Sequence, residues 1–333
     1  LTVSGAATLS TGAVSLNSNG SAILFSSTLD GAQTLGLTAG LGNITFTGAV
    51  GLVSRLGAVT VTSGATVLAS QTFTAASFTQ SAGTVATTFA QAVNLTNQFD
   101  FTGQALSMNG VGSNVVGTSM DVTNAGLFTT ANGANITTAG TFIQDGAGAN
   151  SLGGNITTTN SLISFLRGVT LTSGILLNTG AGAGNILFSS TLDGAQTLGL
   201  TAGLGNITFT GAVGLVSRLG AVTVTSGATV LASQTFTAAS FTQSAGTVAT
   251  TFAQAVNLTN QFDFTGQVLN INGTAVTNVV GTTMDVTNAG LFTTANGANL
   301  SVGNEFTQDG AGLNSIGGNI ASTNDGIAFA TGV

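Results

Sequence analysis

The chain has 333 residues, of which 43% are hydrophobic and only 4% are charged, and its formal net charge is −7. This combination excludes intrinsic disorder, which needs low hydrophobicity and high charge. Three arginines without a lysine exclude a basic surface for nucleic acid or anionic lipid, and the absence of cysteine excludes a disulfide framework and a thiolate metal site. No run of 18 apolar residues occurs, so we expect no transmembrane helix and no membrane insertion.

Short β-strands are predicted from the first residues onward, because apolar residues alternate with threonine. Clear examples are residues 43–47 (NITFT), 58–62 (AVTVT) and 71–74 (QTFT). Turn dipeptides separate such segments, and they include Asp30-Gly31, Ser63-Gly64, Asn109-Gly110, Asn132-Gly133 and Asp145-Gly146. No sustained helical periodicity with caps is present, so we expect no significant helix.

These segments recur with a period of about 20 residues. Phe25 and Phe46 are 46 − 25 = 21 residues apart, and Asn135 and Asn155 are 155 − 135 = 20 apart. A period of this length that carries several short strands indicates one coil, or rung, of a parallel β-helix. We therefore predict an all-β fold, a β-solenoid with rungs of about 20 residues, in which Val, Ile, Leu and Phe fill the interior and Thr, Ser and Asn form ladders.

A longer repeat divides the chain into two tandem units. The stretch from Ile23 to Gln104 recurs without a change from Ile186 to Gln267, an offset of 186 − 23 = 163 residues. We predict one continuous solenoid over residues 1–333, built from tandem units of approximately 1–163 and 164–333. Neither residues 1–5 nor residues 327–333 resemble a polar cap, so we expect a longer parent polypeptide or end-to-end stacking of copies.

Three segments of the first unit carry a resemblance to a known family. They are residues 29–35 (LDGAQTL), 41–50 (LGNITFTGAV) and 56–63 (LGAVTVTS), and the same run recurs from Leu192 to Ser226. This pattern resembles the repeats of very large bacterial surface proteins, the filamentous-haemagglutinin-like and autotransporter-like adhesins. The resemblance implies a right-handed parallel β-helix, export to the bacterial cell surface, and a role in adhesion, aggregation or extracellular filaments.

Few side chains are suited to catalysis, since His, Lys, Cys and Tyr are absent. Five aspartates precede glycine and are interpreted as turn residues: Asp30, Asp145, Asp193, Asp309 and Asp325. Asp100 and its copy Asp263 lie between phenylalanines and are expected to point to solvent. Arg55 and its copy Arg218 are interpreted as solvated turn arginines. Calcium-binding and phosphate-binding motifs do not fit, so we predict no catalytic, cofactor-binding or metal-binding residue and no cofactor.

The leading functional hypothesis is therefore a structural segment of an extracellular fibre or adhesin that is not an enzyme. Its expected partner is a further copy of itself, and cell-surface glycans are a second possibility. An alternative is a carbohydrate- or cell-binding adhesin stalk. Ice binding would use Thr-x-Thr pairs such as Thr60 with Thr62 and Thr72 with Thr74, which do not repeat on every rung. A polysaccharide-degrading β-helix would need a cleft that holds three or more carboxylates from adjacent rungs.

Overall fold

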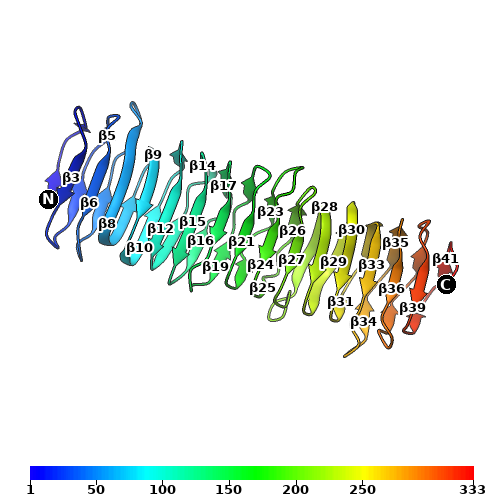
Figure 1. Cartoon of the computed structure of the whole chain (residues 1–333). Coiled ribbons are helices and arrows are strands. Elements are labelled where there is room, and N and C mark those ends of the chain that lie inside the picture. Colours follow the sequence, from blue (N-terminus) through cyan, green and yellow to red (C-terminus); the bar gives the residue numbers. More distant parts are fainter. The chain divides into compact units, whose positions relative to one another are not determined.

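The computed structural model describes residues 1–333 and contains strands but no helix. The chain forms two compact units, Leu1–Ser161 and Leu162–Val333. Each unit is a stack of β-coils, with about 21 residues in a coil and about 16 coils in the chain (Figure 1). The predicted fold class, an all-β solenoid, is thereby confirmed. Its right-handedness and its continuity over residues 1–333 stay predictions.

The strands are short, and most have three to five residues. The first unit contains β1 (Thr2–Val3), β2 (Ala7–Thr8), β3 (Val14–Asn17), β4 (Ile23–Phe25), β5 (Leu29–Asp30), β6 (Leu35–Thr38), β7 (Ile44–Phe46), β8 (Leu56–Ala69), β9 (Phe73–Gln80), β10 (Gly83–Phe89), β11 (Val93–Leu95), β12 (Phe99–Gly103), β13 (Ala105–Met108), β14 (Gly112–Val116), β15 (Met120–Asn124), β16 (Phe128–Thr130), β17 (Ala134–Thr138), β18 (Phe142–Gln144), β19 (Asn150–Leu152) and β20 (Ile156–Thr158). The second unit contains β21 (Ile163–Phe165), β22 (Val169–Leu171), β23 (Ile175–Asn178), β24 (Ile186–Phe188), β25 (Leu192–Asp193), β26 (Leu198–Thr201), β27 (Ile207–Phe209), β28 (Leu219–Ala232), β29 (Phe236–Gln243), β30 (Gly246–Phe252), β31 (Val256–Leu258), β32 (Phe262–Gly266), β33 (Val268–Ile271), β34 (Asn278–Val280), β35 (Met284–Asn288), β36 (Phe292–Thr294), β37 (Leu300–Val302), β38 (Phe306–Gln308), β39 (Asn314–Ile316), β40 (Ile320–Ser322) and β41 (Ile327–Phe329).

In the regular coils each strand pairs in parallel with the strand three positions later in the chain. In the first unit β12 pairs with β15 and β15 with β18, while β13, β16 and β19 form a second row and β14, β17 and β20 a third. A coil therefore has three strands and three faces. The register Phe99↔Met120↔Phe142 places apolar residues directly above one another. Like side chains thus stack along each unit.

The core follows from alternation along the strands, because every second side chain points inward. Phe25 and Phe46 stack with ring centroids 5.2 Å apart and planes 4° apart. Further along the first unit, Phe73, Phe78, Phe89 and Phe99 form a cluster whose neighbouring rings meet at 5.2–5.7 Å. All four are fully buried. The repeated phenylalanine spacing therefore identifies the core correctly.

The interior also contains amide side chains, which the sequence analysis had not placed there as a connected network. In the first unit Gln144 Nε2 donates to Asn124 Oδ1 (2.8 Å), and Asn150 Nδ2 donates to Gln144 Oε1 (3.0 Å). Both bonds recur with the same lengths in the second unit, among Asn288, Gln308 and Asn314. The bond between Gln144 and Asn124 joins neighbouring coils, and the bond between Asn150 and Gln144 lies within one coil. Buried amides are stabilising only when they are paired, and these bonds pair them.

One corner differs in length between the two units. Residues 110–114 of the first unit correspond to residues 273–278 of the second, which are one residue longer. Asn114 nevertheless makes the same bonds as Asn278: its Nδ2 donates to the carbonyl of Gly110 (3.1 Å), as that of Asn278 does to Gly273 (3.0 Å). The longer corner shortens the strand that follows it: β14 begins at Gly112, whereas β34 begins at Asn278, and the pairing is the same from Asn114 and Asn278 onward.

Candidate functional site

One outward sheet face in each unit carries a row of Thr, Ser and Asp side chains and is here called the polar face. Two columns of side chains run along it, one residue of each column on every coil. In the first unit the first column consists of Thr60, Thr79, Asp100, Asp121 and Ile143. The second column consists of Thr62, Ser81, Thr102, Thr123 and Asp145. The columns follow from the register, which sets successive residues about 4.8 Å apart. The second unit repeats both columns, with Thr307 in place of Ile143.

Three carboxylates of adjacent coils come together on this face. Asp100 pairs in register with Asp121, and Thr123 Oγ1 donates to Asp145 Oδ1 (2.7 Å). Burial raises the pKa of the Asp121 carboxyl above its ordinary value, and the charges of Asp145 and Asp100 raise it further. Asp121 Oδ1 has no hydrogen-bond partner.

The second unit has the same arrangement with one more acidic neighbour. Burial raises the pKa of Asp285, and Asp309, Asp263 and Glu305 add to that rise in decreasing order. Asp121 and Asp285 were not among the residues predicted to matter, and Asp145 and Asp309 were predicted only as turn residues. The signal was present, since Asp100 and Asp121 are one rung apart and both alternate with inward residues.

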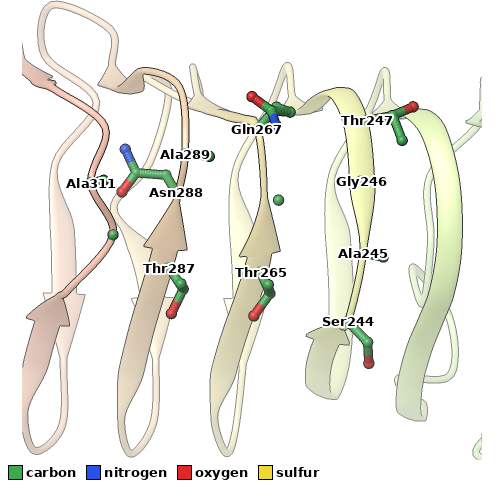
Figure 2. A pocket seen from close by; sticks show the side chains of 12 residues that line it. Ser244, Ala245, Gly246, Thr247, Thr265, Gln267, Thr287, Asn288, Ala289 and Ala311 are labelled. Carbon is green, nitrogen blue, oxygen red and sulfur yellow. The ribbon is translucent and has the colours of Figure 1, made fainter.

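A shallow groove lies next to the polar face in each unit. In the first unit it measures about 410 Å³ and is lined by residues 81–84, 102–104 and 123–125 together with Ala147. In the second it measures about 350 Å³ and is lined by the equivalent residues 244–247, 265–267, 287–289 and 310–311. Figure 2 shows Ser244, Thr265 and Thr287 on successive coils along one side of it.

The carboxylates lie beside this groove and do not line it. Glycosidases hold their two carboxyl groups on opposite sides of the bond that they cleave, whereas Asp100 and Asp121 stand side by side in one column. No group of three or more acidic side chains has the geometry to hold a metal ion. The arrangement offers hydrogen-bond acceptors and hydroxyl groups to a ligand on the surface.

The interpretation of Arg55 as a solvated turn residue is wrong, because it joins three coils. Its guanidinium donates to the carbonyl oxygens of Ala75 (2.8 Å) and Asn94 (2.7 Å) and to Asn94 Oδ1 (3.2 Å). We call this set the arginine bridge. Arg218 forms the same bridge to Ala238 and Asn257, with the same three distances. The sequence could not show it, since the partner lies 39 residues away.

Asp30 anchors the loop that leads to the arginine bridge. Its Oδ1 accepts hydrogen bonds from the backbone N–H groups of Val53 (2.8 Å) and Ser54 (3.1 Å), and Asp193 does the same in the second unit. Asp325 accepts from the N–H of Gly326 within its own turn (2.9 Å). Asp325 thus acts within its own turn, as predicted, whereas Asp30 and Asp193 bond to a loop of the next coil.

The threonine pairs considered for ice binding do not repeat on every coil, as the sequence predicts. Thr60 and Thr62 stand at the head of the two columns, but Asp100 and Asp121 replace threonine further along the first column. A strict threonine array is therefore limited to a short part of the polar face.

Comparisons with protein-family models, curated proteins and solved structures gave no match to this chain. The structure contains no helix long and apolar enough to cross a membrane.

Proposed function

We propose that this chain is a structural segment of an extracellular bacterial fibre or adhesin, extended by stacking of coils within a long repeat polypeptide or between copies. The observation that carries the proposal is the exact duplication of bonds between coils. The arginine bridge, the aspartate anchor and the buried amide network all recur in both units with matching partners. The duplicated features are those that hold coils together.

The arginine bridge explains how a coil stack gains resistance to local unfolding. In repeat proteins each coil is stabilised mainly by its two neighbours, so the stack can open one coil at a time. A guanidinium that bonds to the next coil and to the one after it must be released before either can separate. Such a bond suits a segment that bears load.

Composition supports a durable and self-associating material. With 4% charged residues, copies of the chain experience little electrostatic repulsion. Trypsin needs an accessible arginine or lysine, and the chain offers three arginines, of which Arg55 and Arg218 are half-buried and held in bridges. We expect trypsin to cleave the folded chain only at Arg167, which is exposed.

Two measurements on the purified chain test this proposal. Cryo-electron microscopy at increasing protein concentration should show filaments with an axial repeat of about 4.8 Å, the spacing of stacked strands. Trypsin digestion of the same sample, followed by mass spectrometry, should leave Arg55 and Arg218 uncleaved. A chain that stays monomeric at high concentration and is digested rapidly at all three arginines would overturn the proposal.

A further inference from the structure

We propose that Asn19 is a site of spontaneous deamidation, at which its side-chain amide is replaced by a carboxylate with water as the only co-reactant. The inference concerns the covalent chemistry of one corner and does not depend on the function proposed above. Three observations carry it: an Asn-Gly sequence in an exposed turn, a glycine N–H group without a partner in that turn, and two other exposed Asn-Gly turns whose glycine N–H groups are bonded.

The reaction uses only the asparagine, the residue that follows it and water. The backbone nitrogen of the following residue attacks the side-chain carbonyl carbon Cγ, a bond forms between them, and the side-chain nitrogen leaves as ammonia with the proton that the backbone nitrogen has lost. Water then opens the resulting succinimide ring at one of its two carbonyl carbons. The product is either aspartate or isoaspartate, whose backbone continues through Cγ. Glycine favours the attack because it has no Cβ to hinder the approach.

The turn at Asn19 and Gly20 leaves the reacting groups free. Both residues are exposed, and both have a positive φ, 51° and 90°. The turn is closed by the N–H of Ser21, which donates to the carbonyl of Ser18 (3.2 Å), and the N–H of Asn19 donates to Asn17 Oδ1 (2.9 Å). Neither bond uses the N–H of Gly20 or the side-chain amide of Asn19. A Cβ on Gly20 would have no atom within 4 Å, so solvent reaches this nitrogen.

Two further Asn-Gly turns have an exposed asparagine but a bonded glycine. They are formed by Asn132 with Gly133 and by Asn296 with Gly297. The N–H of Gly133 donates to the carbonyl of Gly153 in the next coil (3.1 Å), and that of Gly297 donates to Gly317 (2.9 Å). A bonded N–H must be released by local opening before its proton can be lost, as in amide exchange. Exposure of the asparagine therefore does not distinguish these turns from Asn19, whereas the bond of the glycine does.

The remaining two Asn-Gly sequences have a buried glycine. They are Asn109 with Gly110 and Asn272 with Gly273. The N–H groups of these glycines donate no hydrogen bond, but the backbone of the preceding coil packs closely against them. A Cβ on Gly110 would lie 2.4 Å from the nitrogen of Ala92, and one on Gly273 would lie 2.5 Å from that of Ala255. Because such packing restricts the movement that the attack needs, we expect both sites to react more slowly than Asn19.

The modification affects one unit only. The equivalent corner of the second unit, residues 178–185, reads NTGAGAGN and contains no Asn-Gly sequence. The new carboxylate is ionised at neutral pH, so the net charge changes from −7 to −7 − 1 = −8. Isoaspartate also lengthens the backbone beside the next coil, where a Cβ on Gly40 would lie 3.3 Å from Gly20 Cα. The product is therefore a permanent mark of age at one corner of the chain.

Mass spectrometry of the folded full chain tests the inference. The chain is incubated in mildly alkaline H₂¹⁸O, so that sites modified during the incubation carry the heavy isotope and those modified during digestion do not. It is then unfolded and digested with chymotrypsin, whose cleavage after phenylalanine separates all five Asn-Gly sequences. We expect Asn19 to react at least about fivefold faster than Asn132 and Asn296, the effect of one hydrogen bond. Equal rates at these three sites would overturn the inference.

The unfolded chain and one variant provide the controls. In guanidinium chloride all glycine N–H groups are free, so the excess rate at Asn19 should disappear; an excess that persists there would show that local sequence, and not the fold, determines the reactivity. Asn19→Gln should abolish labelling of residues 1–25, because glutamine would have to close a larger and less favourable ring. Labelling that persists in this variant would assign the reaction to Asn17 and overturn the inference.

Discussion

The contribution of ring–ring contacts to the core can be measured with two phenylalanines of equal burial. Phe78 and Phe101 are both fully buried. Phe78 contacts three rings, those of Phe73 (5.7 Å), Phe89 (5.2 Å) and Phe99 (5.2 Å), whereas Phe101 contacts none. Aromatic pairs contribute about 0.5–1.5 kcal/mol each beyond the burial of area. Three pairs predict that Phe78→Leu destabilises its coil by at least about 1.5 kcal/mol more than Phe101→Leu does.

Hydrogen exchange with mass spectrometry is the suitable assay, because a repeat protein opens locally and need not unfold in one step. Residues 23–104 and 186–267 give peptides of identical mass, so both copies must be changed together. We therefore compare two double variants. The first combines Phe78→Leu and Phe241→Leu, and the second combines Phe101→Leu and Phe264→Leu. Amides of β9 and β12 should exchange about tenfold faster or more in the first pair than in the second. Equal exchange in the two variants would refute the reasoning, since burial alone would then account for the core.

Three further predictions concern the polar face and the contacts between coils. Asp121→Asn with Asp285→Asn should raise the melting temperature at pH 7. Folding raises the pKa of both carboxyl groups. The stability that their protonated form contributes is therefore complete below the unfolded pKa near 3.8 and is lost as the pH rises through the folded pKa. A gain in melting temperature that persists in acid would contradict this origin. Arg55→Met with Arg218→Met should destabilise the bridged coils by about 2 kcal/mol, measured as faster amide exchange there, and unchanged exchange would contradict a role for the bridge. Gly148→Ala should prevent normal packing of its coil, because the added methyl would overlap the carbonyl of Gly126; circular dichroism and melting that match the wild type would contradict this.

The sequence predicted the fold because its two periods are independent of each other. Alternation along a strand identifies inward residues such as Phe99 and Phe101, and the rung period places Phe25 above Phe46. Both can be read without knowing where any corner lies. The tandem repeat further predicts that the two units have the same strands and the same contacts.

The candidate site was less predictable because it depends on the length of every intervening coil. Asp100, Asp121 and Asp145 come together only because the register advances by 21 residues from Asp100 to Asp121 and by 22 from Thr123 to Asp145. The arginine bridge depends on two such coils in succession. Buried amides such as Gln80 are also hidden, since glutamine in a turn-rich sequence is ordinarily an exposed residue.

The corner at residues 273–278 has a practical consequence. One additional residue there leaves Asn278 bonded as Asn114 is, so the pairing of the coils is kept from Asn278 onward. Residues 274–277 are all exposed. A foreign peptide spliced into this corner would be displayed to solvent while the coils beneath it keep their alignment. The chain is thus suited to serve as a scaffold for presenting epitopes or enzymes, with the shorter corner of the first unit as its unmodified reference.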